Sequence, residues 1–308
     1  MQTPPRPPIG HSYAATLLFV VASITPPLPA STLTISRYIA YVSTRLSTSS
    51  IPPYLNTIKL LHIEAGLPNP LSSNFHISSL IKGVHRQLAT PPNQKLPITP
   101  AILLQMHACL DLSRPILVSF WAACLVAFYS FFRKSTLLAK SPLHSCKTEF
   151  CIRDLIISPT TALLNVKHTK TLQFFNRLVQ VPLPHIPQSP LCPISALLNL
   201  LSLLSGAPSS LSLFSYPLPG GGFSHLTYTS FSKLLATVLI ESGTSPSQYS
   251  GHSFRRGGAS FAFSCGIPSD LIKIQGDWSS DAYLRYLTSP LSSRQKLVNS
   301  LSLHILQL

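Results

Sequence analysis

Acidic residues are scarce in this chain. Its 308 residues include 8 Asp and Glu against 23 Lys and Arg, and the few carboxylates are dispersed along the sequence. Such a set makes a poor cage for Mg²⁺ or Ca²⁺, which bind through several neighbouring oxygen ligands. The formal net charge of +15 favours a polyanionic partner, with nucleic acid ahead of an anionic membrane surface.

Regularly spaced cysteines are also missing. The six cysteines, at positions 109, 124, 146, 151, 192 and 265, form no CxxC pair, so the sequence argues against a zinc site or a disulfide framework. Free thiols in a reducing compartment are the expectation. No secretory signal is expected either, because the apolar run 14–24 follows a Pro-rich start and lacks a clear cleavage site.

Long apolar runs are limited to one, Pro115 to Phe132, which lies between Arg114 and Arg133. Eighteen uncharged residues are long enough to span a bilayer. The serines and small residues in the run, and the lack of a second comparable run, favour a helix buried in a protein core. We therefore expect no membrane partner, and a single-span membrane protein is the alternative.

The hydrophobic fraction of 45% excludes a wholly disordered chain, and the length favours two domains. Prolines crowd residues 1–30 and predict a disordered leader. Apolar residues at helical spacing over 34–46, 54–61 and 77–88 predict a small helical domain at 31–90. The Pro-rich run 91–99 predicts a linker, and a larger domain is expected over 100–308.

The larger domain is predicted to be mostly helical with a small antiparallel β-sheet, so the fold class is mainly α. A glycine run at 220–222 predicts a loop. The expected helices are 100–112, 115–132, 193–204, 228–239, 253–265, 269–275 and 281–287, and the expected strands are Ile152, 155–157, 163–166 and 179–183.

The most informative stretch is GHSFRRGGASFAFSCGIPSDLIKIQGDWSSDAYLRY, residues 251–286. His252 and Arg255 stand three residues apart at a helix start and project from one face, where backbone N–H groups also favour an anion. This geometry suits a phosphate. Gly257 and Gly258 would let the helix approach a partner closely.

This stretch resembles the tyrosine recombinases, also called the phage integrase family, and especially the Crypton- and DIRS-type enzymes of eukaryotic mobile elements. GHSFRRGGAS matches the family's His-x-x-Arg box, with His252 and Arg255 in the named positions. GDWSSDAYLRYL looks like the closing box, in which Trp278 precedes Tyr286 by eight residues. The resemblance therefore adds an indole and a phenol to the expected site.

Two further boxes lie upstream in the family's order. FYSFFRKSTLL is similar to the first arginine box and points to Arg133, while VKHTKTLQ resembles the β-hairpin lysine motif and points to Lys170. Residues 31–112 look like the family's helical, SAM-like core-binding domain, which binds DNA, and YLNTIKLLHIEAGLPNP is the most similar part. The domain over 100–308 would then be the mixed α+β catalytic domain.

The resemblance implies a site-specific DNA recombinase or integrase. Such an enzyme cuts and rejoins DNA strands through a 3′-phosphotyrosyl intermediate without metal, other cofactor or ATP. Tyr286 would be the nucleophile, the two arginines would bind the non-bridging oxygens, and His252 would be the acid/base partner. Trp278 would donate a hydrogen bond and Lys170 would protonate the leaving oxygen. The implied catalytic residues are Arg133, Lys170, His252, Arg255, Trp278 and Tyr286.

Several alternatives stay open in the sequence. Tyr283 is a second candidate nucleophile, and Lys167 competes with Lys170. The family's first arginine box carries an acidic residue three positions on, where this chain has Thr136, and residues 1–30 are Pro-rich where the family has a DNA-clamping helix. A catalytically degenerate DNA-binding protein derived from a mobile-element recombinase is therefore the alternative function.

The resemblance also predicts partners and location. Double-stranded DNA is the expected partner, together with further copies of this chain in a tetramer on paired sites, and no small-molecule substrate is expected. Residence in the nucleus is inferred from the DNA substrate and the eukaryotic resemblance.

Overall fold

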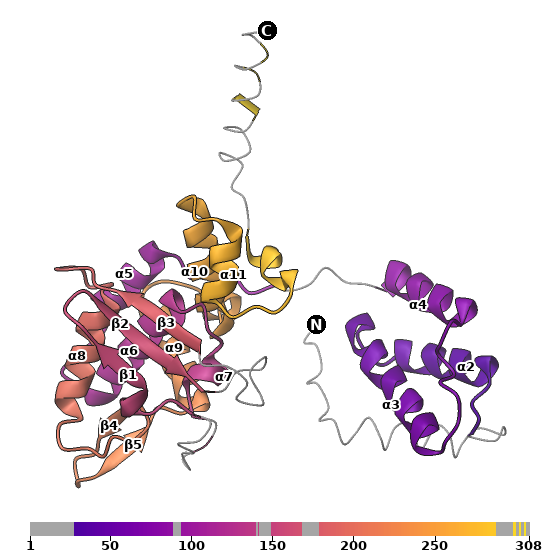
Figure 1. Ribbon diagram of the computed structural model, residues 1–308, viewed down its shortest axis with the longest axis horizontal. Helices are drawn as coiled ribbons and strands as arrows, with labels where there is room; N and C mark the ends of the chain where they lie inside the picture. Colours follow the sequence, from indigo (N-terminus) through magenta and orange to yellow (C-terminus); the bar gives the residue numbers. More distant parts are fainter. Residues whose placement is uncertain are drawn as a thin grey trace. The chain divides into compact units, whose positions relative to one another are not determined.

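The structure is a computed structural model that describes residues 28–88, 94–139, 141, 149–167 and 179–287, with isolated positions 298, 299, 302 and 305. The chain divides into two compact units, residues 1–93 and 94–308 (Figure 1). The division falls inside the range predicted as a linker. Most of the Pro-rich leader, residues 1–27, and the predicted catalytic Lys170 lie outside the described residues.

The described part of the first unit consists of helices α2 (Thr32–Ser43), α3 (Ile51–Glu64) and α4 (Phe75–Leu88), with a 3₁₀ turn η1 (Thr48–Ser50) before α3. The Ser31 side chain caps α2 by accepting a hydrogen bond from the Thr34 N–H. The apolar stripes of the three helices meet in one core, formed by Ile35, Tyr38, Ile39, Val42, Ile51, Leu55, Ile58 and Ile77. These helices occupy the ranges that the apolar spacing predicts.

Helix α6 (Pro115–Tyr129) lies at the centre of the second unit, and every residue from Leu117 to Phe128 is buried. It packs against α8 (Pro193–Leu203) and α10 (His252–Ser264). The long uncharged run is therefore a core helix. No helix among the described residues combines the length and hydropathy that crossing a bilayer requires.

The remaining helices of the second unit complete the framework around α6. They are α5 (Pro100–Ala108), α7 (Lys134–Leu137), α9 (Tyr228–Glu241) and α11 (Ser269–Gln275), with the 3₁₀ segments η2 (Ile152–Asp154), η3 (Pro246–Gln248) and η4 (Asp281–Tyr286).

A three-stranded antiparallel sheet covers one side of this unit. Its order is β1 (Leu155–Ile157), β2 (Thr161–Val166), β3 (Val179–Pro184), and Leu164 of β2 pairs with Leu155 and with Val181. Alternate residues of β2 are buried, as expected for a sheet with one face on the core. The prediction of a mainly α fold with a small antiparallel sheet is confirmed.

Three short elements differ from the sequence expectation. The glycine run 220–222 forms a loop as predicted, but it joins two short paired strands that were not predicted, β4 (Ser215–Pro217) and β5 (Phe223–His225). Ile152 begins the 3₁₀ turn η2 where a strand was predicted, and η4 is a 3₁₀ segment where an α-helix was predicted. Elements this short contain too few residues to establish a period of 2 or 3.6, so spacing does not distinguish them.

The second half of the predicted linker packs on the second unit. The Leu96 N–H donates to the Gln248 carbonyl at 2.8 Å, and the Ile98 N–H donates to the Ser253 carbonyl at 3.0 Å. Ile98 is completely buried in the main core. The prolines of this run prevent a helix, but they permit an extended segment whose hydrogen bonds go to another part of the chain.

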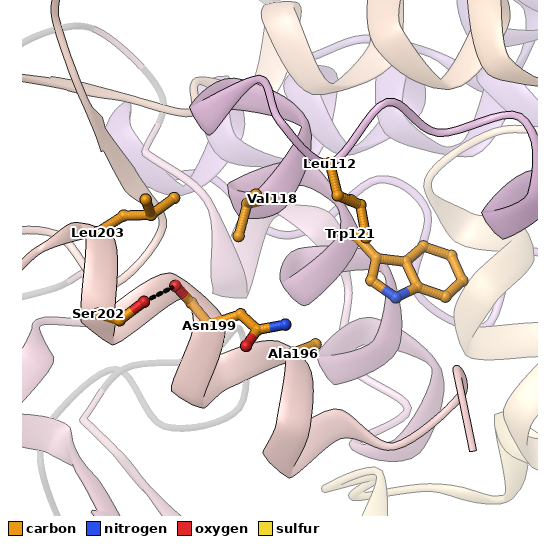
Figure 2. A pocket seen from close by; sticks show the side chains of 7 residues that line it. All are labelled: Leu112, Val118, Trp121, Ala196, Asn199, Ser202 and Leu203. Atoms are coloured by element: carbon orange, nitrogen blue, oxygen red, sulfur yellow. Dashed lines mark hydrogen bonds between the residues drawn. The ribbon is translucent and has the colours of Figure 1, made fainter. Parts of the chain in front are cut away.

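A small cavity of about 190 Å³ lies beside α6 and α8 (Figure 2). Its lining is Leu112, Val118, Trp121, Ala196, Asn199, Ser202 and Leu203. None of these side chains is charged, and the Trp121 Nε1–H donates to the Pro190 carbonyl at 3.3 Å. The cavity therefore offers no acid or base, its Ser202 hydroxyl donates to the Asn199 carbonyl, and the candidate site lies elsewhere.

Candidate active site

Helix α10 carries two of the predicted site residues on its first turn. His252 is its first residue, and Arg255 follows one turn later with 2% of its surface exposed. A methyl group at Gly257 would lie 1.8 Å from the Ile98 carbonyl oxygen, and one at Gly258 would lie 2.0 Å from the Phe128 carbonyl oxygen. The two glycines therefore allow α10 to contact backbone segments of its own chain directly, where the sequence predicted close approach to a partner.

The Arg255 guanidinium is held from one side. Nη1 donates to the Gly276 carbonyl at 3.0 Å and also to the carbonyl of Phe131. Phe131 has φ 53, a left-handed conformation that costs a residue with a side chain about 1 kcal/mol. Arg255 Nε and Nη2 are buried and have no hydrogen-bond partner. Two N–H groups next to one another are therefore left for an anionic ligand.

Trp278 stacks on this guanidinium, whose Cζ lies 3.7 Å from the indole centroid. A methyl group at Gly276 would lie 1.7 Å from the indole ring, so glycine is required there for the stacking. The buried Trp278 Nε1–H has no hydrogen-bond partner. Unpaired buried N–H groups are costly in a folded protein, and here they belong to neighbouring side chains of the predicted phosphate site.

The positive charge of Arg255 is poorly solvated. Burial, and then the nearby charge of Arg133, lower the pKa of Arg255 to about 9. The group is still protonated at neutral pH. Arg133 is half-buried at the N-cap of α7, and its positive charge is one of the causes of the lowered pKa of Arg255. A bound anion would relieve the repulsion between the two charges.

His252 and Tyr286 meet directly. The His252 Nε2 atom and the Tyr286 hydroxyl oxygen are 2.8 Å apart, and their ring centroids are 5.2 Å apart. Tyr286 ends η4, and its carbonyl accepts a hydrogen bond from the Ser260 hydroxyl on α10. The nucleophile predicted at the end of the closing box is thus held against the start of α10.

The protonation state of His252 suits proton acceptance. Burial, followed by the charges of Arg255, Arg133 and Arg256, lowers the pKa of His252 from 6.5 to about 4. The imidazole is therefore neutral at physiological pH. In the tautomer that leaves Nε2 unprotonated, this atom can accept the phenol proton of Tyr286.

The second candidate nucleophile, Tyr283, occupies a different environment. It is buried, with 6% of its surface exposed, and its ring centroid lies 5.8 Å from that of Trp278. It belongs to a small hydrophobic cluster that also includes Phe131 and Ile272. Of the two tyrosines, Tyr286 is the one whose hydroxyl is hydrogen-bonded to His252. The motif spacing alone did not exclude Tyr283, because both residues follow Trp278 within one short segment.

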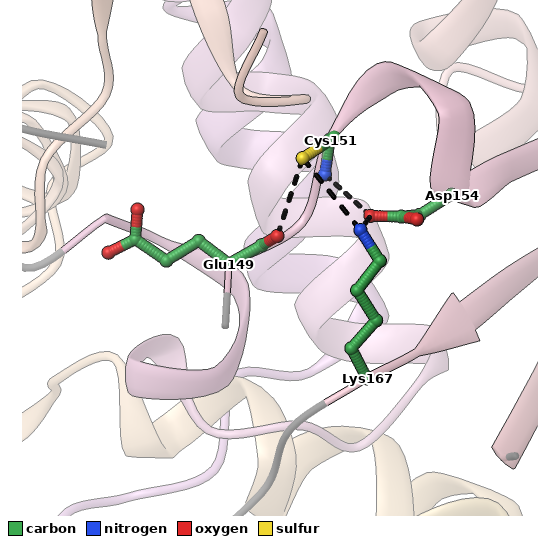
Figure 3. Close-up of polar contacts among 4 residues, drawn as sticks. All are labelled: Glu149, Cys151, Asp154 and Lys167. Atoms are coloured by element: carbon green, nitrogen blue, oxygen red, sulfur yellow. Dashed lines mark hydrogen bonds and ion pairs between the residues drawn. The ribbon is translucent and has the colours of Figure 1, made fainter. Parts of the chain in front are cut away.

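Of the two candidate lysines, the structure describes Lys167 but not Lys170. Lys170 lies outside the described residues and stays a prediction. Lys167 follows β2, and its Nζ lies 2.6 Å from Asp154 Oδ2 and 3.9 Å from Cys151 Sγ (Figure 3). Asp154 is buried and also accepts a hydrogen bond from the Cys151 N–H at 2.9 Å. This ion pair gives Lys167 a structural role at the end of β2, which no sequence motif indicates.

Thr136 stands at the position where an acidic residue was expected from the resemblance. It is half-buried, and its N–H donates to the Arg133 carbonyl at 2.8 Å in the short helix α7. No group of three or more His, Cys, Asp and Glu side chains able to hold a metal ion occurs among the described residues.

Comparisons with known proteins match the fold. No protein-family model and no curated protein matches the chain. The XerH site-specific recombinase, in its post-cleavage complex with palindromic difH substrate, is 14% identical with a TM-score of 0.63, covering 95% of this chain and 78% of that one. The Tn1549 transposon integrase, in complex with transposon right end DNA, is 12% identical with a TM-score of 0.63, covering 98% and 96%.

A second structure of the Tn1549 integrase, with circular intermediate DNA, is 12% identical with a TM-score of 0.58 and covers 94% of this chain and 92% of that one. The chain therefore has the tyrosine-recombinase fold. The fold predicted from the motifs is confirmed at identities too low for the sequence alone to establish it.

Proposed function

We propose that this chain is a tyrosine-type DNA strand-transfer enzyme, a site-specific recombinase or integrase. The observation that carries the proposal is the contact between the Tyr286 hydroxyl and His252 Nε2, at 2.8 Å, next to a buried Arg255 with two unpaired nitrogens. A nucleophile, a neutral base and an unsatisfied cation are thus assembled together. Nucleophilic attack on a phosphodiester requires these three groups.

Double-stranded DNA is the proposed substrate. The net charge of +15 supports binding to a phosphate backbone. The XerH and Tn1549 proteins that share the fold were solved as complexes with DNA. A single phosphodiester carries one negative charge, which matches a site where two guanidinium groups repel one another.

In the first step, the Tyr286 oxygen attacks the phosphorus and passes its proton to His252 Nε2. The bond between phosphorus and the 5′-oxygen breaks, and that oxygen takes a proton from Lys170. The products are a 3′-phosphotyrosyl protein and a free 5′-hydroxyl. Attack by the 5′-hydroxyl of another strand reverses the sequence of bonds and restores Tyr286, so no external energy source is consumed.

The two arginines act on the charge that develops on the non-bridging oxygens. A charge pair at about 4 Å and an effective dielectric near 20 is worth roughly 4 kcal/mol before desolvation is subtracted. Arg255 is buried in the folded protein before DNA binds, so folding has already removed water from its guanidinium. Little further reorganisation of this group is needed during the reaction. Trp278 Nε1–H is a further donor for the same oxygens.

A DNA-binding protein without turnover is the second candidate. It is favoured by the burial of Arg255, whose Nη1 is already bound to two backbone carbonyls, and by Thr136 in place of an acidic residue. In this case the basic surface would still bind duplex DNA, with affinity that falls steeply as salt rises.

A suicide substrate, nicked near the target phosphate so that the cleaved end is lost, separates the two candidates. The enzyme predicts a covalent protein–DNA adduct that is abolished by Tyr286→Phe and retained by the matched control Tyr283→Phe. Duplex binding without any adduct from the unmodified chain would instead support the second candidate.

Two broader properties belong to the same proposal. Strand exchange requires two cleaved duplexes, so we expect four copies of the chain on a pair of sites. The resemblance to Crypton- and DIRS-type enzymes supports an origin in a mobile element and residence in the nucleus.

A further inference from the structure

The segments that carry Arg133 and His252 touch one another through the neighbouring residues, Lys134 and Gly251. A methyl group at Gly251 would lie 2.3 Å from Lys134 Cδ and 2.9 Å from Cγ. The aliphatic part of Lys134 therefore lies directly against the Gly251 backbone. Gly251 is the N-cap of α10, and Lys134 is the first residue of α7.

The ammonium end of Lys134 is anchored on a third element. Its Nζ donates to the Ser232 hydroxyl at 3.0 Å and lies 3.7 Å from the centroid of the Tyr228 ring. Both residues belong to the beginning of α9, and the Tyr228 N–H donates to the Ala139 carbonyl at 2.9 Å. One side chain thus joins α7, α9 and the start of α10.

We propose that Lys134 is a positioning residue that sets the separation between Arg133 and His252 in the active site. The inference rests on the proposed function and adds to it a residue that does not touch the substrate. The stem of Lys134 fixes how closely the start of α10 approaches α7, and its ammonium keeps the stem from rotating away. Loss of either part would let Arg133 move relative to His252.

A change in the separation between Arg133 and His252 should change the pKa of His252. The groups that face the imidazole are Arg255 and Arg256 from its own helix, Arg133 from the segment before α7, and the Tyr286 hydroxyl from η4. Removing Lys134 allows Arg133 to move away, so the pKa of His252 should rise from about 4 toward its ordinary value of 6.5.

Gly251 provides a matched test of the same contact. Its φ of −56 and ψ of −18 are right-handed helical values that alanine adopts without strain. Gly251→Ala alone should disturb the site, because the new methyl group collides with the Lys134 stem. In a Lys134→Ala background the space is vacant, so the same Gly251→Ala change should be nearly neutral. This non-additivity is specific to a direct contact.

The experiment compares Lys134→Ala, Lys134→Arg, Gly251→Ala and the double alanine variant in the full chain. We expect Lys134→Ala and Gly251→Ala each to slow adduct formation on the suicide substrate by on the order of tenfold. Lys134→Arg keeps a cation and a long stem, and should recover most of the rate. Duplex affinity and its salt dependence should be unchanged, since the proposed role involves no phosphate.

Histidine NMR titration gives a readout independent of activity. The His252 resonance, assigned by its loss in His252→Asn, should titrate at higher pH in Lys134→Ala than in the unmodified chain. An unmodified chain that forms no adduct would contradict the proposed function, while the titration would still decide the positioning role.

Two results would overturn the inference. One is a Lys134→Ala chain with an unchanged adduct rate and an unchanged His252 pKa. The other is a loss of duplex affinity accompanied by a salt slope lower by about 1, which identifies a direct phosphate contact. If Lys134→Ala fails to fold, Gly251→Ala in the unmodified background and Lys134→Arg provide the same comparison.

Discussion

The guanidinium of Arg255 and the indole of Trp278 lie face to face, with Arg255 Cζ 3.7 Å from the ring centroid. The stack covers one face of the guanidinium, and the carbonyls of Phe131 and Gly276 occupy Nη1. What is left is the Nε and Nη2 edge. A planar fork with a single available edge matches two oxygens of a phosphate, and this geometry is the reason for the first prediction.

Replacing Arg255 with lysine should strongly impair catalysis although the charge is kept. Lysine lacks the planar fork and the stacking surface, and the carbonyls that hold Nη1 would lose their donor. We expect Arg255→Lys to reduce adduct formation by about 100-fold or more. Duplex affinity, measured by fluorescence anisotropy, should fall much less, because Arg255 is one of 23 Lys and Arg residues in the chain and phosphate contacts are usually shared among many cations. Equal losses of binding and adduct formation would identify Arg255 as a docking residue.

The stability of the second unit should depend on pH through His252. The pKa of His252 is about 4 in the folded chain, against an ordinary value of 6.5 that applies to the unfolded chain. Between pH 4 and 6.5 the unfolded chain therefore binds more protons than the folded chain. Stability is therefore fully present above pH 6.5 and decreases as the pH falls through 6.5 toward 4. Urea unfolding followed by tryptophan fluorescence measures this, since Trp121 and Trp278 both lie in the second unit. His252→Gln should flatten the dependence, and an unchanged slope would contradict the shifted pKa.

Folding lowers the pKa of His252, and binding of duplex DNA should raise it again. A phosphate placed between Arg133 and Arg255 adds a negative charge beside the imidazole, so the pKa of His252 should rise above about 4 when a duplex is bound. NMR titration of the Tyr286→Phe chain, with and without duplex, tests this without cleavage. A pKa unaffected by bound duplex would place the phosphate elsewhere.

Gly257 should not tolerate alanine. The added methyl group would lie 1.8 Å from the Ile98 carbonyl oxygen, and separating α10 from that backbone should cost about 2 kcal/mol or more of unfolding free energy. The matched control is Gly83→Ala in α4, where the methyl group has no neighbour within 4 Å. Removing a helix-interior glycine there should stabilise the first unit by about 0.5–1 kcal/mol. Chemical unfolding followed by circular dichroism and by tryptophan fluorescence distinguishes the two units.

The buried ion pair at the end of β2 should be much more sensitive than an exposed one. Asp154→Ala removes the partner of Lys167 and the acceptor of the Cys151 N–H, and should cost about 3 kcal/mol of unfolding free energy. The control pair, Lys273–Asp281, has a similar distance of 2.8 Å but is exposed. Asp281→Ala should cost much less than Asp154→Ala, because solvent screens an exposed pair. Similar losses for the two variants would show that burial does not strengthen the Asp154 pair.

Much of the architecture was accessible from local patterns. The sequence predicts helix α6 from a long uncharged run, and it predicts β2 from a short apolar stretch that follows the break at Ser158-Pro159. The short helix α7 and the β4–β5 hairpin were missed, since three or four residues do not define a period. The burial of Ile98 was missed for a different reason. Its extended segment is stabilised by hydrogen bonds to α10 and the loop before it, which leave no trace in the local sequence.

The motifs identified which side chains to examine, but their contacts depend on the folded chain. Spacing placed His252 and Arg255 on one helical turn, because that relation is local. It left Tyr283 and Tyr286 both open as nucleophiles, and only the packing of η4 against α10 brings the Tyr286 hydroxyl to His252.

Composition and short-range periodicity were sufficient for the basic character of the chain, its helices and its small sheet, because charge and periodicity are properties of neighbouring residues. The pairing of Tyr286 with His252, the stacking of Trp278 on Arg255, and the contact between Lys134 and Gly251 were decided by the tertiary structure. Each joins separate segments through packing and burial, and no local pattern encodes how closely two such segments approach.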